Sequence, residues 1–203
     1  MARHADKYTL IRSVYQTGPA VHQFESHPGS VVLEPGDFGQ NCVQAMRLVE
    51  RGTRFVTVNI FPPLLGGNTR GNTWDMHGWG PFSSTSSYRD VVGPMYDLAY
   101  STLLENLHRK GLLENTLVVS MGEFGRTPRI NPSGGRDHWP HCWTIMMAGG
   151  GIRGGQVYGS SDKWGAEPRD KPVTPAMITA TINRTLGIQD SAQDSPAPVL
   201  PLF

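Results

Sequence analysis

The sequence predicts an α/β protein, with a three-layer α/β/α sandwich built around a mostly parallel sheet. Apolar strand patterns alternate along the chain with amphipathic helix patterns, which is typical of α/β domains. The strongest strand patterns are nearly continuously apolar, as expected for strands covered on both faces. With 203 residues, of which 38% are hydrophobic, the chain is long enough to bury a core of its own.

Each predicted element has a local signal. Strands rich in β-branched and apolar residues are expected at 8–14, 54–60, 116–121, 143–148 and 156–158. Helices are expected from the N-cap Asp37 to Glu50, over about 88–110 with Gly111 as its stop, and from Thr174-Pro175 to Gly187. The order strand, long helix, strand over 54–121 predicts a right-handed βαβ unit with parallel strands.

The helix over 88–110 carries an apolar face. That face comprises Val91, Val92, Met95, Leu98, Ala99, Thr102, Leu103 and Leu107, which recur at helical spacing and should meet the core. Between 16 and 36 the chain consists mainly of turn-forming Gly and Pro positions, so no core element is expected there. The predicted organisation is a residual loop-rich segment at 1–36, an α/β domain at 37–188 and an extended tail at 189–203.

Composition excludes several classes of protein. The 18 basic and 17 acidic side chains leave a net charge of +1, which gives no electrostatic footprint for nucleic acid. No apolar run is long enough to span a membrane, and no signal peptide opens the chain, so as it stands it is expected to be cytoplasmic. Cys42 and Cys142 are too few for a disulfide framework. Two buried thiols are favoured, with a single bridge as the alternative.

Polar clusters follow two of the strongest strand patterns. The run Trp74-Asp75-Met76-His77-Gly78 comes after the strand at 54–60, and Glu123 comes directly after the strand at 116–121. The run Gly135-Arg136-Asp137-His138-Trp139-Pro140-His141 lies later in that second loop. In an open parallel sheet, ligands bind beyond the carboxyl ends of the strands. The clusters are therefore expected at one edge of the sheet.

Carboxylate and imidazole side chains at one edge point to a metal site. Asp75 and His77 could ligate one ion if their loop bends back, and Asp137-His138 repeats the same pair of residue types. Oxygen and imidazole ligands together suit Zn, Mn or Fe(II), and Mg or Ca where oxygens dominate. Glu123 must be solvated, paired or bound to a cation. The alternative is that Asp75 caps a turn and His77 is an ordinary surface residue.

Arg126 and Arg136 flank this cluster. Their planar guanidinium groups suit bidentate binding of phosphate, sulfate or carboxylate, and salt bridges to Glu123 or Asp137 are the alternative. Trp74, Trp79 and Trp139 either stack on sugar rings or, as is favoured, brace the loops. Several serines lie near the cluster, but none occupies a nucleophile elbow, so no nucleophile is identified.

Several runs of the chain resemble a known family. They are 47–59, Trp74-Asp-Met-His-Gly78, 111–119, Gly122-Glu-Phe-Gly-Arg-Thr-Pro128, Gly135-Arg-Asp-His-Trp-Pro140 and 148–159. Together they resemble the bacterial, sulfatase-like domain-of-unknown-function 1501 family of the alkaline-phosphatase superfamily, over roughly Phe38 to Ile188. Members of that superfamily are three-layer α/β hydrolases of sulfate or phosphate esters that use one or two divalent ions.

The resemblance implies a role for each candidate residue. Asp75, His77, Glu123 and His138 look like ligands of a divalent ion, which would be Zn, Mn, Ca or Mg. Glu123 and Arg126 look catalytic, and the resemblance makes a small-molecule or glycan sulfate or phosphate ester the expected substrate. The resemblance also implies that contacts to the metal ligands or to the substrate come from Arg136, Asp137, His141, Trp74 and Trp139.

The sequence also departs from the family pattern. Glu123 and Phe124 stand where the alkaline-phosphatase turn has Asp and His, and the segments with the first metal ligand and the nucleophile have no counterpart, as in a truncated and internally deleted member. A non-catalytic module that binds a metal or an anionic glycan through the same cluster is therefore the alternative, and a non-functional remnant is a third. Relatives are often exported through a twin-arginine signal, which is not seen here.

Overall fold

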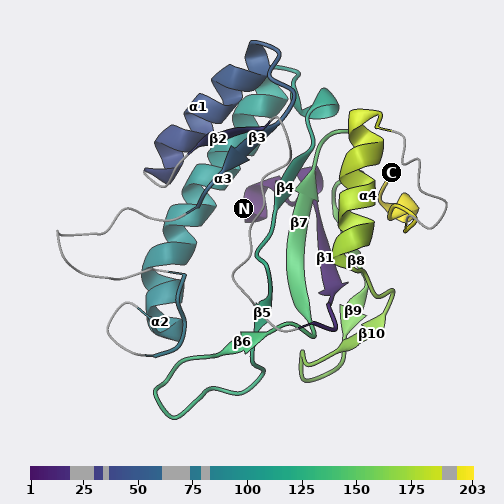
Figure 1. The fold of residues 1–203 in the computed structure, drawn as a ribbon. Coiled ribbons are helices and arrows are strands. Elements are labelled where there is room, and N and C mark those ends of the chain that lie inside the picture. The colour runs from purple at the N-terminus through teal and green to yellow at the C-terminus, as the bar shows by residue number, and fades with distance from the viewer. Residues whose placement is uncertain (19–29, 34–36, 61–73, 79–82, 189–195) are drawn as a thin grey trace. The chain divides into compact units, whose positions relative to one another are not determined.

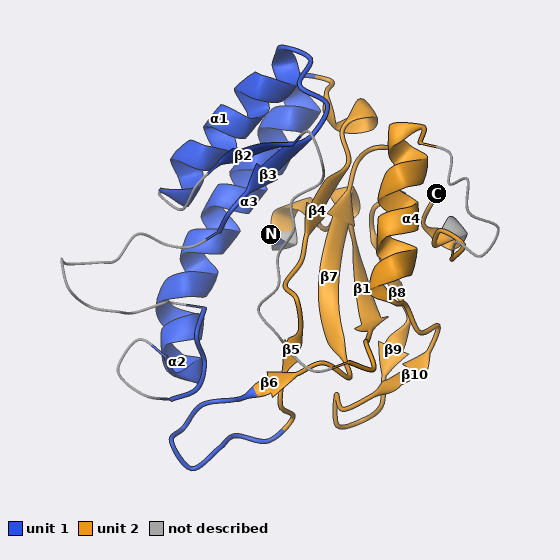
Figure 2. Cartoon of the chain, viewed as in Figure 1, with its two compact units in different colours: residues 1, 23–110, 129–137 blue, residues 2–22, 111–128, 138–203 orange. Residues whose placement is uncertain are grey.

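The computed structural model describes residues 1–18, 30–33, 37–60, 74–78, 83–188 and 196–203. The chain divides into two compact units, coloured separately in Figure 2. Unit 1 comprises residues 1, 23–110 and 129–137, and unit 2 comprises residues 2–22, 111–128 and 138–203. Both units contain helices and strands, which confirms the predicted α/β class. None of the helices in the described ranges is long and apolar enough to cross a membrane.

Unit 1 contains a two-stranded parallel sheet formed by β2 (Val31–Leu33) and β3 (Val56–Val58). Strand β2 falls in the region where no core element was expected, and Leu33 within it is buried, so that expectation is wrong. A strand of three residues is too short to show the alternation from which strands are recognised. Strand β3 confirms the strand at 54–60 in shortened form, but its residues are only partly buried instead of covered on both faces.

Helix α1 (Phe38–Glu50) follows the sequence prediction closely (Figure 1). Asp37 is its N-cap, and the carboxylate accepts a hydrogen bond from the backbone N–H of Gln40 at 2.8 Å. This bond satisfies one of the amide groups that have no partner inside the helix. Phe38, Cys42 and Ala45 form the buried face.

The predicted helix over 88–110 is a continuous helical path with three parts. A short α2 (Thr85–Ser87) leads into the π-helical turn η2 (Tyr88–Val92) and then into α3 (Gly93–Arg109). The wider π turn precedes Pro94, whose ring cannot take part in regular α-helical hydrogen bonding. Tyr100 and Leu104 join Val92, Ala99 and Leu107 in the core.

Three residues of the predicted apolar face of this helix are exposed, namely Val91, Leu98 and Thr102. Leu98 is 71% exposed and Val91 is 39% exposed, so their assignment to the core-facing side is wrong. Leu98 is next to Ala99 in the chain, and one position corresponds to a rotation of about 100° around an α-helix. Apolar character alone did not distinguish these neighbours.

Unit 2 is built on a four-stranded sheet in the order β4-β7-β1-β8 (Figure 1). Its strands are β4 (Val118–Ser120), β7 (Trp143–Ala148), β1 (Tyr8–Val14) and β8 (Gln156–Tyr158). The β4–β7 and β7–β1 pairings are antiparallel and only β1–β8 is parallel. The sheet is therefore mixed, and the predicted three-layer sandwich with a mostly parallel sheet is not confirmed.

The predicted βαβ unit is also wrong. Strand β3 pairs with β2, whereas β4 pairs antiparallel with β7, so the two strands that flank the long helix belong to different sheets. Alternation of strands and helices along a chain is compatible with several strand pairings, and the parallel βαβ pairing is only the most common of them.

The core of unit 2 lies between this sheet, helix α4 (Pro175–Leu186) and the end of the chain. Thr174 caps α4 by accepting a hydrogen bond from the backbone N–H of Met177 at 3.3 Å, and the helix ends at Gly187, as predicted. The last residues include the 3₁₀ turn η4 (Leu200–Leu202), with Val199 and Leu202 buried. Of the tail predicted as extended, 189–195 lie outside the described residues, and in the remainder Val199 and Leu202 pack into the core.

The remaining elements are short. Two antiparallel hairpins are formed by β5 (Gly125–Arg126) with β6 (His138–Trp139), and by β9 (Ser160–Ser161) with β10 (Pro168–Asp170). The 3₁₀ turns η1 (Ala2–Lys7) and η3 (Leu113–Asn115) precede β1 and β4. Cys42 and Cys142 are both buried free thiols, which confirms the favoured prediction.

Candidate functional site

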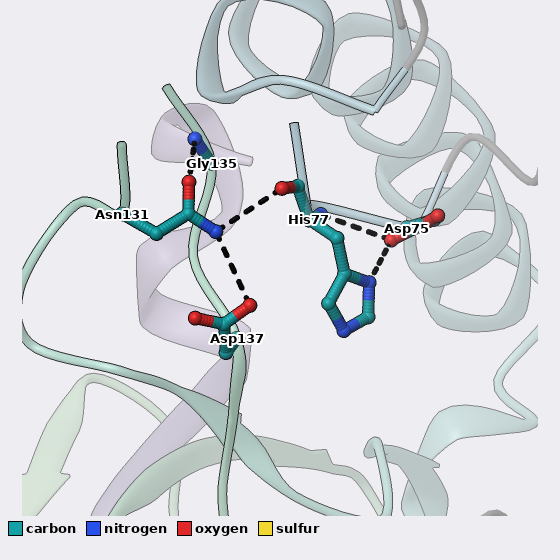
Figure 3. Close-up of polar contacts among 5 residues, drawn as sticks. All are labelled: Asp75, His77, Asn131, Gly135 and Asp137. Atoms are coloured by element: carbon teal, nitrogen blue, oxygen red, sulfur yellow. Dashed lines mark hydrogen bonds and ion pairs between the residues drawn. The ribbon is translucent and has the colours of Figure 1, made fainter. Parts of the chain in front are cut away.

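Asp75 and His77 are paired with each other in unit 1 (Figure 3). One carboxylate oxygen of Asp75, Oδ1, accepts a hydrogen bond from the backbone N–H of His77 at 3.0 Å and also contacts Nδ1 of its ring. The backbone bond closes a small Asx turn, which brings the imidazole back onto the carboxylate. Both side chains are partly buried, at 35% and 28% exposed.

This geometry gives the two residues different roles. Because Nδ1 lies against the carboxylate, Nε2 is the ring nitrogen on the side away from Asp75. A carboxylate that orients an imidazole in this way is found beside metal-ligating histidines and beside general bases. The arrangement differs from the sequence-based picture in which Asp75 and His77 are two equivalent ligands.

Asn131 connects this pair to Asp137 (Figure 3). Its side-chain nitrogen donates to the backbone carbonyl of His77 at 3.1 Å and to Asp137 Oδ1 at 3.2 Å. Its side-chain oxygen accepts from the backbone N–H groups of Ser133 and Gly135, at 3.0 and 2.9 Å. One amide thus shapes its own loop and attaches that loop to a segment 54 positions away in the sequence.

The two segments meet backbone to backbone. The N–H of Arg136 donates to the carbonyl of Met76 at 2.5 Å, and a Cβ on Gly135 would lie 2.1 Å from that same oxygen. A Cβ on Gly78, which has φ +85°, would lie 2.3 Å from the carbonyl oxygen of Ser133. Only glycine permits so close an approach, so both positions are required for the contact.

Trp74 braces the segment from its other end. Its indole N–H donates to the carbonyl of Ile60, and its ring packs edge-on against Tyr88 and Tyr96 at centroid distances of 5.4 and 5.9 Å. Stacking on a sugar was the other reading of Trp74, and these contacts favour the bracing role. Trp79 lies outside the described residues.

Unit 2 carries Glu123, Arg126 and His138 on the β5–β6 hairpin and the residues before it. Arg126 and His138 are directly opposite each other across the two strands. The His138 ring stacks on Phe124 at a centroid distance of 4.0 Å, and the Arg126 guanidinium lies 5.7 Å from the centre of the Phe124 ring. Glu123 is exposed. The Phe124 ring thus contacts both the Arg126 guanidinium and the His138 imidazole.

Trp139 and His141 form a second contact in unit 2. The indole N–H of Trp139 donates to the carbonyl of Ala166 at 2.7 Å, and His141 packs edge-on against the indole at 4.8 Å. Trp139 therefore holds the β9–β10 hairpin in place, which again favours the bracing role over stacking on a sugar.

The predicted residues are thus divided between the two units. Asp75, His77, Arg136 and Asp137 belong to unit 1, whereas Glu123, Arg126, His138 and His141 belong to unit 2. Strands β3 and β4 are in different sheets, so the loops that follow them do not start from one sheet edge as predicted. Among the described residues, no group of three or more His, Cys, Asp or Glu side chains is arranged to hold a metal ion.

Hydroxyl groups gather at the start of α2. Ser84 lies 2.8 Å from Ser86 and 3.1 Å from Ser87, oxygen to oxygen, and it also accepts a hydrogen bond from the backbone N–H of Ser87. These contacts are those of a helix cap. They do not identify a nucleophile.

Asn131 is the residue that sequence reasoning missed. The signal was present in the run Asn131-Pro-Ser-Gly-Gly135, because Asn followed by Pro, Ser and Gly favours a turn closed by the Asn side chain. The sequence did not reveal that the side-chain nitrogen of Asn131 would donate hydrogen bonds to Asp137 and to the backbone carbonyl of His77.

Comparison with known protein families gives a match over most of the chain. Residues 16–193 match the model of a family described as protein of unknown function (DUF1501). No curated protein matches the chain. The match covers most of the 203 residues and includes the Asp75–His77 pair, the Asn131 loop and the β5–β6 hairpin. The chain therefore belongs to the DUF1501 family.

Proposed function

We propose that this protein is a metal-dependent hydrolase of sulfate or phosphate esters, related to the sulfatases of the alkaline-phosphatase superfamily. The observation that carries the proposal is the His77 imidazole, which the Asp75 carboxylate contacts at Nδ1. Asn131 joins the backbone carbonyl of His77 to the Asp137 carboxylate. An imidazole oriented by a carboxylate is suited to metal binding or proton transfer. The sequence motifs that resemble sulfatase-like proteins select the first of these uses.

His77 is the residue of unit 1 best suited to bind a divalent ion. Metal-ligating histidines usually donate the second ring N–H to a carboxylate, which fixes the tautomer and raises the basicity of the ligating nitrogen. Asp75 stands in that position, so Nε2 of His77 would be the ligand. When bound, the ion would activate water or a hydroxyl group and neutralise negative charge on the transferred group.

The described residues of unit 1 offer an incomplete donor set by themselves. The Asp137 carboxylate could add oxygen ligands to this set, because Asn131 bonds both this carboxylate and the backbone carbonyl of His77. Glu123 and His138 remain ligands predicted from the sequence, and their contribution is tested by variants below. Arg126 is the proposed contact for the anionic ester, because a guanidinium group matches sulfate and phosphate oxygens in a bidentate manner.

A second candidate function is a non-catalytic module that binds a metal or an anionic glycan. It is favoured by the serine cluster at α2, in which Ser84 caps the helix. The hydrolase requires both metal binding and turnover, whereas the module binds a metal or a glycan without turnover, so measuring both properties separates the two candidates.

The experiment measures bound metal and turnover on the same protein. The purified chain would be loaded separately with Zn, Mn, Ca and Mg, analysed for metal content, and assayed with aryl sulfate and aryl phosphate esters. The key variants are His77→Ala and Asp75→Asn, and His108→Ala is the matched control, since His108 is an exposed histidine of the same unit.

Metal-dependent turnover that is lost in His77→Ala, reduced in Asp75→Asn and kept in His108→Ala would support the hydrolase. Metal binding with the same dependence but without turnover would support the binding module. A chain that binds none of the four ions would contradict the hydrolase and the metal-binding form of the module. Glu123→Ala and His138→Ala then test whether unit 2 supplies further ligands, and Arg126→Lys tests for weaker binding of the ester.

A further inference from the structure

A short segment of unit 2 is held by contacts typical of a bound peptide. Residues 196–203, here called the tail segment, include the turn η4 and lie beside α4 (Figure 1). Val199 and Leu202 are 1% and 0% exposed and belong to the core cluster of unit 2. A hydrogen bond from the Leu202 N–H to the Val199 carbonyl, at 3.2 Å, closes the turn between them. Residues three apart in such a turn lie on one side of it, so the tail segment presents an apolar face to unit 2.

Unit 2 also binds the backbone of the tail segment. The N–H of Val199 donates to the hydroxyl oxygen of Thr181 on α4 at 2.9 Å. The carbonyl of Leu202 accepts from the backbone N–H of Arg153 at 2.7 Å and from the side-chain amide of Gln156 at 3.4 Å. Domains that recognise peptides combine contacts of these two kinds, since main-chain hydrogen bonds hold the ligand and pockets for its side chains select it.

Two arginines contact Phe203 at the end of the tail segment. The guanidinium group of Arg153 donates to the Phe203 carbonyl at 2.7 Å. The guanidinium group of Arg184, on α4, lies 5.3 Å from the centre of the Phe203 ring, a favourable arrangement of a cation and an aromatic ring. The residues that bind the tail segment in these ways are called the tail-docking surface, which comprises Arg153, Gln156, Thr181 and Arg184.

The polar groups of the tail-docking surface have other partners besides the tail segment. The hydroxyl of Thr181 donates to the carbonyl of Met177 at 2.7 Å, so it keeps this bond when Val199 is removed. The side-chain amide of Gln156 also donates to the carbonyl of Arg153 at 2.9 Å. Arg153 is exposed, so water can solvate its guanidinium group. Departure of the tail segment therefore leaves none of these side chains buried without a hydrogen bond, which would otherwise oppose it.

A polar stretch of sequence connects the tail segment to α4. Residues 189–195 read Gln-Asp-Ser-Ala-Gln-Asp-Ser and contain no large apolar side chain. None of the contacts of Val199, Leu202 and Phe203 with the tail-docking surface involves this connector. An identical tail segment from a second copy of the chain would therefore make the same hydrogen bonds and bury the same side chains. Exchange of an identical element between protomers is a low-cost route to a dimer.

We propose that the tail-docking surface is a peptide-binding site that takes the tail segment of a second copy in reciprocal exchange. Within one chain the tethered tail segment competes with an effective concentration on the order of millimolar. Exchange therefore increases with protein concentration, and a substitution that weakens the chain's own tail segment opens the surface to a partner. The inference uses residues of unit 2 alone and does not rest on the proposed hydrolase activity.

The first test supplies the tail segment as a separate peptide. A synthetic peptide with the sequence of residues 196–203 would be added to the full chain carrying Leu202→Ala, or Val199→Ala, which removes fewer buried atoms. The melting temperature of both variants should rise, and that of the wild-type chain should rise much less. A control peptide that itself carries Leu202→Ala should have no effect. Adding Thr181→Val to the Leu202→Ala chain should weaken peptide binding roughly tenfold in calorimetry. The inference is overturned if neither variant responds, or if both peptides act equally.

The second test asks whether a second copy supplies the tail segment. Full-length Thr181→Val has an intact tail segment, and full-length Leu202→Ala has an intact tail-docking surface. The two would be mixed at about millimolar concentration with EDTA present, so that no divalent ion contributes, and sized by light scattering. We expect a mixed dimer that melts above either variant alone, because it contains one wild-type pair of segment and surface. Leu202→Ala mixed with Val199→Ala is the matched control, since both tail segments are defective. Exchange is overturned if the first mixture stays monomeric, even where the peptide binds, or if the control gains equally.

Discussion

Asn131 and Gly135 illustrate how single residues hold the candidate site. The amide of Asn131 reaches the backbone of His77 and the carboxylate of Asp137, while Gly135 lets the two backbones approach. Neither residue type carries out chemistry itself. Their effect is to set the position of groups that do, because a loop without them would have both a clash and unpaired amide groups.

The first prediction concerns Gly135→Ala. The added Cβ would lie 2.1 Å from the carbonyl oxygen of Met76, so the loop must move away and the Asn131 bonds must weaken. We expect a loss of about 1–3 kcal/mol in the free energy of unfolding, measured by urea denaturation. Gly18→Ala is the control, because none of the described residues lies within 4 Å of the added atom and its φ is outside the left-handed region. Equal stability of the two variants would contradict the close approach.

The second prediction concerns the pH dependence of stability at Cys42. Burial, and secondarily the Asp37 carboxylate, raise the pKa of this thiol from 9.0 to about 12. Below pH 9.0 the thiol is mainly protonated whether the chain is folded or unfolded. Its full contribution to the free energy of unfolding is therefore present there. Above that pH the unfolded chain loses the proton first, and the folded state therefore loses stability as pH rises.

Urea denaturation at about pH 8 and about pH 10 measures this effect. The wild-type chain should lose more stability over that interval than Cys42→Ala, whose overall stability is lower but whose pH slope lacks the thiol. Parallel pH profiles for the two proteins would show that the Cys42 thiol does not titrate at a raised pKa.

At the scale of secondary structure, the ends of the helices were the most predictable feature. Asp37, Thr174 and Gly187 begin or end helices where their capping chemistry indicates, and Trp143–Ala148 is the strand that its apolar run predicts. These signals are local, since a cap or an apolar run acts within a few residues. The π turn at Tyr88–Val92 and the strand Val31–Leu33 have no comparable local signal.

The third prediction tests the turn η4 at the end of the chain. Leu202 is fully buried in the core of unit 2, although the tail was expected to be extended. Leu202→Ala should cost about 2–5 kcal/mol, because it removes buried methyl groups and leaves a cavity. Leu98→Ala, at a 71% exposed position, should change stability by no more than about 0.5 kcal/mol. Thermal and urea unfolding check both values, and an unchanged Leu202→Ala protein would show that the tail does not pack.

At the scale of the whole molecule, metal binding should be visible as stability. A ligand that binds only the folded state stabilises it by about 2.7 kcal/mol when its free concentration is a hundred times its Kd. We therefore expect the melting temperature to rise on addition of the ion that the chain binds, and His77→Ala to abolish the rise. Asp97→Asn, a change at an exposed carboxylate of unit 1, should leave it intact. An equal rise in the melting temperature of His77→Ala would show that the ion binds elsewhere.

At the candidate site, the sequence predicted the motif but not the residues that it contacts. The motif around Asp75 and His77 was recognisable, and one of the two readings held open was that Asp75 caps a turn, which it does. Which partners the motif would meet was not predictable. That depended on strand pairing, and a parallel sheet was assumed where β4 pairs antiparallel with β7.

Composition, caps and apolar periodicity were enough to establish the α/β class, most helix boundaries and the residues worth testing, since each acts over a few neighbouring positions. The mixed order of the sheet, the loop held by Asn131 and the burial of the final turn were decided only by folding. Each of these joins segments far apart in the chain. Such contacts depend on which surfaces pack best together, and no short stretch of residues contains that information.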